Sequence, residues 1–142
     1  DAMLAKLSLQ SGDAVYFIGD LVGKGDNDWE VLDRVRQLPG GRIILGNHDL
    51  HFIAIKEECA PTRGKDTLKD LLDSPDSGKL SDWLRQQPLA HHETVTTNKG
   101  EENFLMIHAG VAPSWSLKTT MKLSAEVEFA LQNDLCHQDV SY

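Results

Sequence analysis

Short apolar runs alternate with amphipathic segments in the first third of the chain. Residues 14–18 (AVYFI) and 42–45 (RIIL) are short runs rich in β-forming residues, which is typical of buried strands. Between them, residues 29–38 repeat apolar side chains at helical spacing, with Asn27 or Asp28 as the N-cap and PGG as the stop signal. The pattern therefore predicts a strand, a helix and a second strand.

The rest of the chain continues this alternation. A helix is predicted over residues 49–59, directly after the second strand, and two more helical patterns fill residues 65–87 around the turn signal SPDSG. Residues 91–97 and 104–108 predict a hairpin joined by the polar turn NKGEEN, with an alternating first strand and a buried second strand. Residues 116–135 predict a last helix. This order of elements indicates an α/β layered domain.

Composition and charge narrow the classes of partner. The 142 residues suit one domain, and the net charge of -8 argues against nonspecific binding to nucleic acid or to an anionic membrane. A phosphorylated substrate stays open, because a bound divalent metal reverses the local field. No apolar run approaches the ~18 residues of a membrane helix. The two cysteines, Cys59 and Cys136, lack metal or redox spacing and predict thiols in a reducing, cytoplasmic compartment.

Polar side chains capable of binding metal follow three of the predicted strands. Asp20 follows the first, Asn47 follows the second within GNHD, and His108 ends the last. Each alone has an ordinary interpretation: a turn former, a helix cap, and a hydrogen-bonded core histidine. Because ligands of α/β sheets bind at the carboxyl ends of strands, the three together indicate a metal site.

The chemistry of these residue types agrees with that interpretation. A carboxylate can bridge two cations, while an amide oxygen and a neutral imidazole add ligands without adding charge. Two metals ~3.5–4 Å apart can generate a nucleophilic hydroxide and stabilise an in-line phosphoryl displacement. Mixed oxygen and nitrogen donors favour Mn, Fe, Co, Ni or Zn over Ca or Mg.

Three motifs carry a resemblance to a known family. GDLVGKG (19–25), GNHD (46–49) and HAGVAP (108–113) occur in the order found in calcineurin-like metallophosphoesterases. The longer segments GNHDLHFIAI, DWLRQQPL and HAGVAPSWSL are similar to the bacterial symmetrical bis(5'-nucleosyl)-tetraphosphatase branch. The resemblance covers essentially the whole chain. It implies a calcineurin-like fold of layered β-sheets flanked by helices.

The resemblance also implies an activity. The expected reaction is the symmetrical hydrolysis of diadenosine tetraphosphate to two ADP by a metal-bound hydroxide, with two divalent transition metal ions as cofactors. The expected partner is a small dinucleoside polyphosphate, and neither nucleic acid nor membrane is expected. Two alternatives remain open: a phosphoprotein or RNA 5'-end phosphatase of the same superfamily, and a non-catalytic or truncated module.

Roles for individual residues follow from matching the motifs position by position. The resemblance makes Asp20 the metal-bridging carboxylate, and Asn47 and His108 ligands of one metal, with Asn47 also facing the substrate. His48 is expected to be the general acid or a phosphate contact. Asp49 is expected to belong to the catalytic motif by orienting its neighbours.

The chain departs from the family pattern in the loop after the first strand. Lys24, expected to contact the substrate phosphates, stands where the family usually has an arginine, so it lacks the planar bidentate fork. Gly23 stands where related protein phosphatases have an acid that orients the catalytic histidine, so His48 needs another partner.

The ends of the chain also depart from the pattern. The family's first motif, a Gly-Asp-x-His/Gln-Gly turn, is expected before residue 1, and a further metal-binding histidine is expected after Tyr142. Residues 1–142 are therefore expected to be the central part of a metallophosphoesterase domain that carries half of a dinuclear site.

Overall fold

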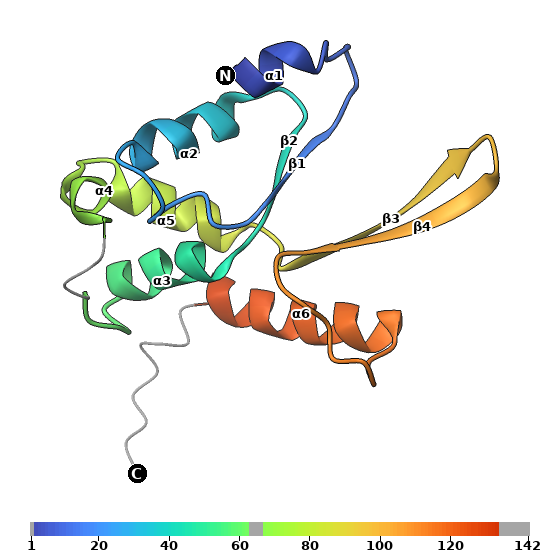
Figure 1. The fold of residues 1–142 in the computed structure, drawn as a ribbon. Helices are drawn as coiled ribbons and strands as arrows, with labels where there is room; N and C mark the ends of the chain where they lie inside the picture. Colours follow the sequence, from blue (N-terminus) through green and yellow to red (C-terminus); the bar gives the residue numbers. More distant parts are fainter. Residues whose placement is uncertain (1, 63–66, 134–142) are drawn as a thin grey trace.

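The computed structural model describes residues 2–62 and 67–133. Helices and strands alternate along these residues as Figure 1 shows. Their order is α1 (Ala2–Lys6), β1 (Val15–Ile18), α2 (Asp28–Gln37), β2 (Gly41–Ile44), α3 (Asn47–Lys56), α4 (Lys69–Asp73), α5 (Ser77–Arg85), β3 (Ala90–Thr97), β4 (Gly100–Ile107) and α6 (Leu117–Gln132). The mixed α/β composition and the positions of the main elements confirm the predicted fold class.

Strands β1 and β2 form a parallel pair, and helix α2 is the connection between them. Val15 lies opposite Gly41 at the start of the pair, and Ile18 lies opposite Ile44 at its end. The predicted strand–helix–strand unit is confirmed. The carboxyl ends of both strands therefore lie together, as parallel pairing requires.

The prediction of a fully buried first strand is wrong at its end. The Ile18 side chain is 47% exposed, whereas Ile44 on β2 is fully buried. In the described residues β1 pairs with β2 alone. Its other edge has no described neighbouring strand to cover it, so apolar character in the sequence does not become burial there.

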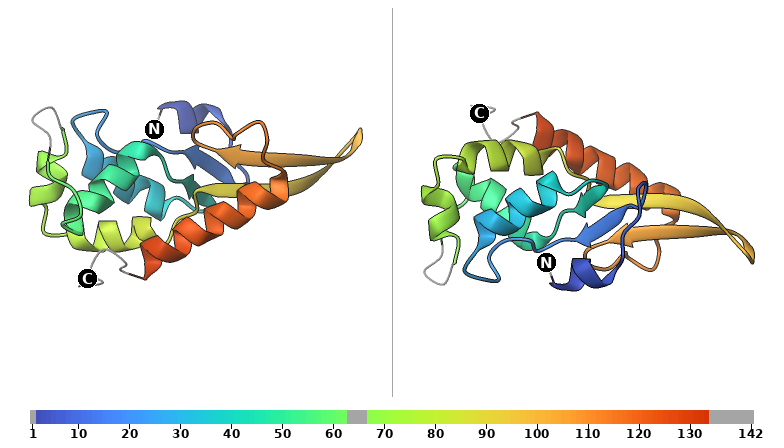
Figure 2. Two further views of the ribbon diagram at one scale, coloured as in Figure 1. Left: turned by 90° about the horizontal axis from the view of Figure 1, so that it is seen from below. Right: turned by 90° about the horizontal axis from the view of Figure 1, so that it is seen from above.

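Strands β3 and β4 form an antiparallel hairpin that projects away from the helices (Figures 1 and 2). Thr97 lies opposite Gly100, so only two residues connect the strands, and most of the predicted polar turn belongs to β4. Gly100 has a φ of +113°, a backbone conformation that a tight reversal needs and glycine readily adopts.

The second strand of this hairpin is not buried as predicted. Phe104 is 44% exposed and Leu105 is 36% exposed, and these neighbours point to opposite faces of the hairpin. Figure 2 shows α6 alongside the base of the hairpin and not along its length. Both faces of the outer part therefore contact solvent.

The core lies between the helices and the inner side of β2. It is built from buried aliphatic residues and one buried phenylalanine, contributed by β2, the residue after it, helices α2, α3, α4 and α5, and the loops before α2 and α4. These are Val22, Leu32, Val35, Ile43, Leu45, Phe52, Ile53, Leu68, Leu71, Leu80 and Leu84. Removing this apolar surface from water is the main stabilising contribution to the fold.

Polar contacts attach α6 and the hairpin to this core. The Arg85 guanidinium donates from Nε to the Leu131 carbonyl oxygen (2.6 Å) and pairs with Glu57 Oε2 (3.2 Å), which links α5 to α6 and α3. The Leu45 N–H donates to the Pro88 carbonyl oxygen (2.8 Å), so the end of β2 lies beside the start of the hairpin. The ends of β2 and β4 are thereby brought to one side of the molecule.

Two sequence predictions on the chain's environment can be compared with the structure. In the described part of the chain, no helix is long and apolar enough to cross a membrane. Cys59 is disulfide-bonded, so the prediction of a thiol at this position is wrong. Cys136 lies outside the described residues. The inference of a reducing compartment rested on free thiols and loses that support.

Candidate metal centre

The three predicted motifs meet at the carboxyl ends of β1, β2 and β4. His108 Nδ1 lies 2.8 Å from the Ile18 carbonyl oxygen, which joins the end of β4 to the end of β1. A Cβ added to Gly19 would lie 2.3 Å from His108 Nδ1 and 2.7 Å from Gly46 Cα. Glycine at position 19 therefore lets all three strand ends approach one another closely.

The Asp20 carboxylate lies at the centre of this junction. Its Oδ1 accepts the backbone N–H of His48 (3.1 Å) and lies 3.4 Å from His108 Nε2, while Oδ2 lies 3.5 Å from Lys24 Nζ. Asp20 has a φ of +55°, which few residues other than glycine adopt. Strained backbone of this kind is concentrated at functional sites.

The charge state of Asp20 follows from the same contacts. Burial alone raises its pKa, but the His48 N–H and the charges of His108, His48 and Lys24 together hold the pKa below its ordinary value. The side chain is therefore a carboxylate at neutral pH, the form that binds metal ions.

The main chain fixes the tautomer of His108. The Ile18 carbonyl oxygen can only accept a hydrogen bond, so His108 Nδ1 carries the proton and donates it. Nε2, the other ring nitrogen, then faces Asp20 Oδ1. Histidines that bind metals are held in the same way, with the other ring nitrogen bonded to a carbonyl or carboxylate.

Asn47 contributes a third candidate donor at the edge of the junction. It is the exposed first residue of α3 and, together with His108 and Trp115, lines an apolar cavity of about 330 Å³. Residues 2–62 and 67–133 contain no group of three or more His, Cys, Asp or Glu side chains able to hold a metal ion. Asp20 and His108, with the Asn47 amide beside them, thus fit one part of a metal site.

The buried side chain of Asp49 supports the junction through hydrogen bonds to its backbone. Its side chain is fully buried, and it accepts the backbone N–H groups of Asp20 (2.9 Å), Leu21 (2.9 Å) and Gly46 (2.8 Å). The Gly46 contact is the backward half of a capping box, because Gly46 is the N-cap of α3 and Asp49 is its third residue. Burial raises the pKa of Asp49 although the three N–H groups lower it. The residue therefore holds two motif loops against each other.

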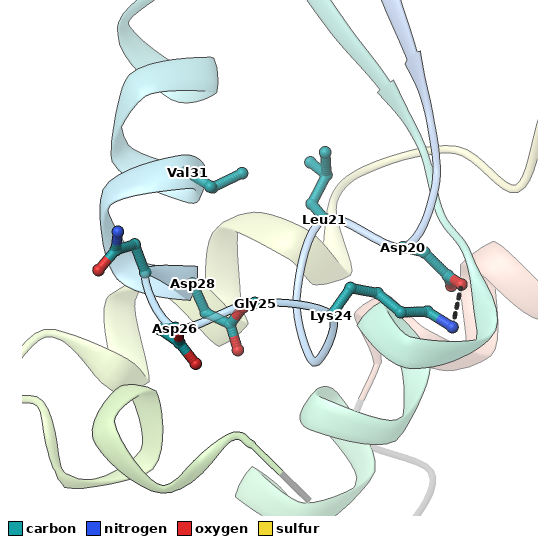
Figure 3. A pocket seen from close by; sticks show the side chains of 8 residues that line it. Asp20, Leu21, Lys24, Gly25, Asp26, Asp28 and Val31 are labelled. Atoms are coloured by element: carbon teal, nitrogen blue, oxygen red, sulfur yellow. Dashed lines mark ion pairs between the residues drawn. The ribbon is translucent and has the colours of Figure 1, made fainter.

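Lys24 lies in the glycine-rich loop after β1. Its side chain is 58% exposed and paired with Asp20, as the dashed line in Figure 3 shows. Both residues line an open cavity of about 430 Å³ together with Asp26, Asp28 and Val31. An exposed positive charge beside a carboxylate is suited to contact an anion.

His48 is the second residue of α3, and its ring lies against the glycine-rich loop. A Cβ added to Gly23 would lie 2.7 Å from His48 Nδ1. The structure thus brings the ring of His48 and the bare backbone of Gly23 into contact. Sequence reasoning missed one residue of this region, Asp28, which it treated only as a possible N-cap. Asn27 takes that position, and Asp28 is the buried first residue of α2.

Gly46 provides a test of the junction. In Gly46→Ala, the new Cβ would lie 2.4 Å from the Asp20 nitrogen and 2.5 Å from Asp20 Oδ1. Because the nearest atom is backbone, the Asp20 loop has to move, and we expect affinity for Mn²⁺ to fall ~10–100-fold, as when supporting residues of metal sites are changed. Isothermal titration calorimetry measures this. Gly78→Ala is the control, since nothing lies within 4 Å of its added Cβ; equal affinities of the two variants would contradict the expectation.

The chain matches the calcineurin-like phosphoesterase family over residues 1–139 and belongs to this family. Similar curated proteins carry the name bis(5'-nucleosyl)-tetraphosphatase, symmetrical. The protein of Stutzerimonas stutzeri is 44% identical over 125 residues, covering 87% of this chain and 43% of the relative.

Two further relatives with the same name agree. The Nitrosospira multiformis protein is 40% identical over 130 residues (91% of this chain, 44% of the relative). The Azotobacter vinelandii protein is 38% identical over 134 residues (93% of this chain, 46% of the relative). The chain therefore spans less than half the length of these relatives. The resemblance seen in the sequence motifs is confirmed.

Proposed function

We propose that the chain is the central part of a hydrolase that cleaves diadenosine tetraphosphate symmetrically into two ADP. The observation that carries the proposal is the Asp20 carboxylate, which faces His108 Nε2 at 3.4 Å and Lys24 Nζ at 3.5 Å. A carboxylate, an imidazole nitrogen and an exposed ammonium at one junction suit metal-assisted cleavage of a phosphoric anhydride. The names of the relatives supply the substrate class.

Asp20, His108 and Asn47 would hold the metal on this side of the site. Bound divalent ions, with Mn or Co as our proposal, would supply a nucleophile from water and neutralise charge on the phosphates. We propose that the other ligands come from segments that the relatives have and these 142 residues do not cover. We also retain the cytoplasm as the proposed location.

The chain's own residues would then handle charge and protons. Lys24, exposed and held only by a 3.5 Å ion pair, moves from Asp20 to the substrate phosphates and neutralises the charge that develops there. Asn47, at the mouth of the apolar cavity, contacts the substrate. Water adds to an inner phosphorus and loses a proton to solvent, the bridging P–O bond breaks, and His48 gives its proton to the oxygen of the departing ADP. Asp49 keeps the two motif loops in register.

Product analysis tests this function. The metal-loaded, full-length protein is incubated with diadenosine tetraphosphate, and ADP is expected as the only product, with turnover lost after chelation of the metal. ATP plus AMP would overturn the symmetrical assignment. Absence of turnover with Mn²⁺ and Co²⁺ would overturn the hydrolase itself and favour a non-catalytic module. Phosphoproteins and RNA 5'-ends serve as comparison substrates, and the net charge of -8 disfavours the RNA.

A further inference from the structure

Asp28 is a buried carboxylate beside the site that the proposed mechanism does not use. Its side chain is only 7% exposed, although it begins helix α2, where a carboxylate usually stays in water. Figure 3 shows it on the wall of the cavity that Asp20 and Lys24 also line. Burying a carboxylate is unfavourable unless it is hydrogen-bonded. The bond that it makes therefore indicates its role.

That hydrogen bond is to Gly23, whose backbone contacts the ring of His48. Asp28 Oδ2 accepts the Gly23 N–H at 2.9 Å. Burial raises the pKa of Asp28, against the Gly23 N–H and the charge of His48, which lower it. The Asp28 carboxylate thus holds the backbone of Gly23 while burial keeps it out of water.

The backbone conformation of Gly23 and its lack of a side chain permit the close contact with His48. Its φ is +72°, and a Cβ at this position would lie 2.7 Å from His48 Nδ1. The imidazole occupies the space that any other residue's side chain would fill. An acid at position 23, as in related protein phosphatases, would collide with the ring in this conformation. The acid stands five residues later in the sequence and reaches back to the same backbone.

We propose that Asp28 is the positioning residue for His48: its carboxylate fixes the Gly23 amide, and the bare Gly23 backbone seats the imidazole. This inference rests on the proposed function, because proton donation by His48 belongs to it. A general acid works only within about 2.6–3.2 Å of the atom that it protonates. Fixing the seat of the ring therefore affects the chemical step more than substrate binding.

Kinetics of the metal-loaded, full-length protein provide the first test. Asp28→Ala removes the acceptor of the Gly23 N–H, and we expect kcat for diadenosine tetraphosphate to fall ~10–100-fold, the cost of a small misplacement, with KM nearly unchanged. Asp28→Asn keeps an oxygen acceptor, so its kcat should stay within about fivefold of the wild type. Asp26→Ala is the matched control, since Asp26 lines the same cavity and is exposed.

A double-mutant cycle separates positioning from a structural role. If Asp28 acts through His48, Asp28→Ala causes no further loss of kcat in a His48→Ala background. Multiplicative losses in the double variant would overturn the proposal, as would wild-type kcat in Asp28→Ala. Equal losses in Asp28→Asn and Asp28→Ala would also overturn it.

A readout without turnover keeps this inference distinct from the proposed function. In nuclear magnetic resonance spectra, Asp28→Ala should speed hydrogen exchange of the Gly23 amide and shift the ring resonances of His48, whereas Asp26→Ala should change neither. Unchanged Gly23 and His48 signals would overturn the inference even if the protein cleaves diadenosine tetraphosphate. Changed signals would support it even if the wild type shows no turnover and the proposed function fails.

Discussion

Asp20→Asn is expected to abolish turnover and leave the fold intact. Asparagine tolerates a positive φ, so it can adopt the +55° of Asp20, and its amide oxygen can still accept the His48 N–H. It lacks the negative charge that attracts a metal and pairs with Lys24 and His108. Losing several kcal/mol of metal-assisted stabilisation corresponds to a fall in kcat on the order of 10³-fold or more.

Three measurements on the same variant check this result. Steady-state kinetics with diadenosine tetraphosphate give the loss of turnover, calorimetry with Mn²⁺ gives the loss of metal affinity, and thermal unfolding shows whether the fold persists. Asp82→Asn on the exposed face of α5 is the control. Near-full activity of Asp20→Asn with metal present would contradict the assignment of Asp20 as a metal ligand.

Asp49→Ala is expected to have the largest effect on stability. Three backbone N–H groups, those of Asp20, Leu21 and Gly46, would lose their acceptor at a buried or half-buried position. Each buried unsatisfied group costs about 1–3 kcal/mol, so the three together should lower the free energy of unfolding by ~3–9 kcal/mol. That is a large part of the ~5–15 kcal/mol that stabilises a typical domain.

Urea denaturation measures this loss. Asp49→Asn should lie between the wild type and Asp49→Ala, because its single oxygen can keep the two bonds of Oδ2 but not the Leu21 bond of Oδ1. Asp82→Ala, at an exposed position, should change stability by less than about 0.5 kcal/mol. If Asp49→Ala unfolds at the same urea concentration as this control, Asp49 does not hold the loops together.

The features that sequence predicted well are those set by local pattern. The apolar runs before Asp20 and Asn47 form the parallel pair, and the amphipathic stretch between them forms α2 within one residue of the predicted bounds. Parallel pairing then forces the ends of β1 and β2 together, so the meeting of Asp20 and Asn47 followed from topology. His108 reaches them from β4 of a separate sheet, which the pairing of β1 and β2 does not determine. Whether these side chains bind metal is a prediction that the experiments above test.

The features that the sequence did not predict are those in which neighbouring elements determine whether a side chain is buried. Ile18, Phe104 and Leu105 are apolar, yet their exposure is set by which elements lie next to them, and periodicity carries no such information. The sequence predicts Asp28 only as a possible helix cap. Its burial arises from the path of the glycine-rich loop, which local pattern does not reveal.

In each contact that supports the site, a side chain is bonded to a main-chain group. Asp49 binds three amide groups, Asp28 binds the Gly23 amide, and His108 binds the Ile18 carbonyl. Exchanging the side chain of Ile18 leaves that carbonyl in place, so such positions can drift in evolution without cost to the chemistry. Alanine scanning would find positions such as Ile18, which contribute only a main-chain group, to be neutral. Saturation mutagenesis should instead find intolerance at glycines and to proline, which alter the peptide backbone itself.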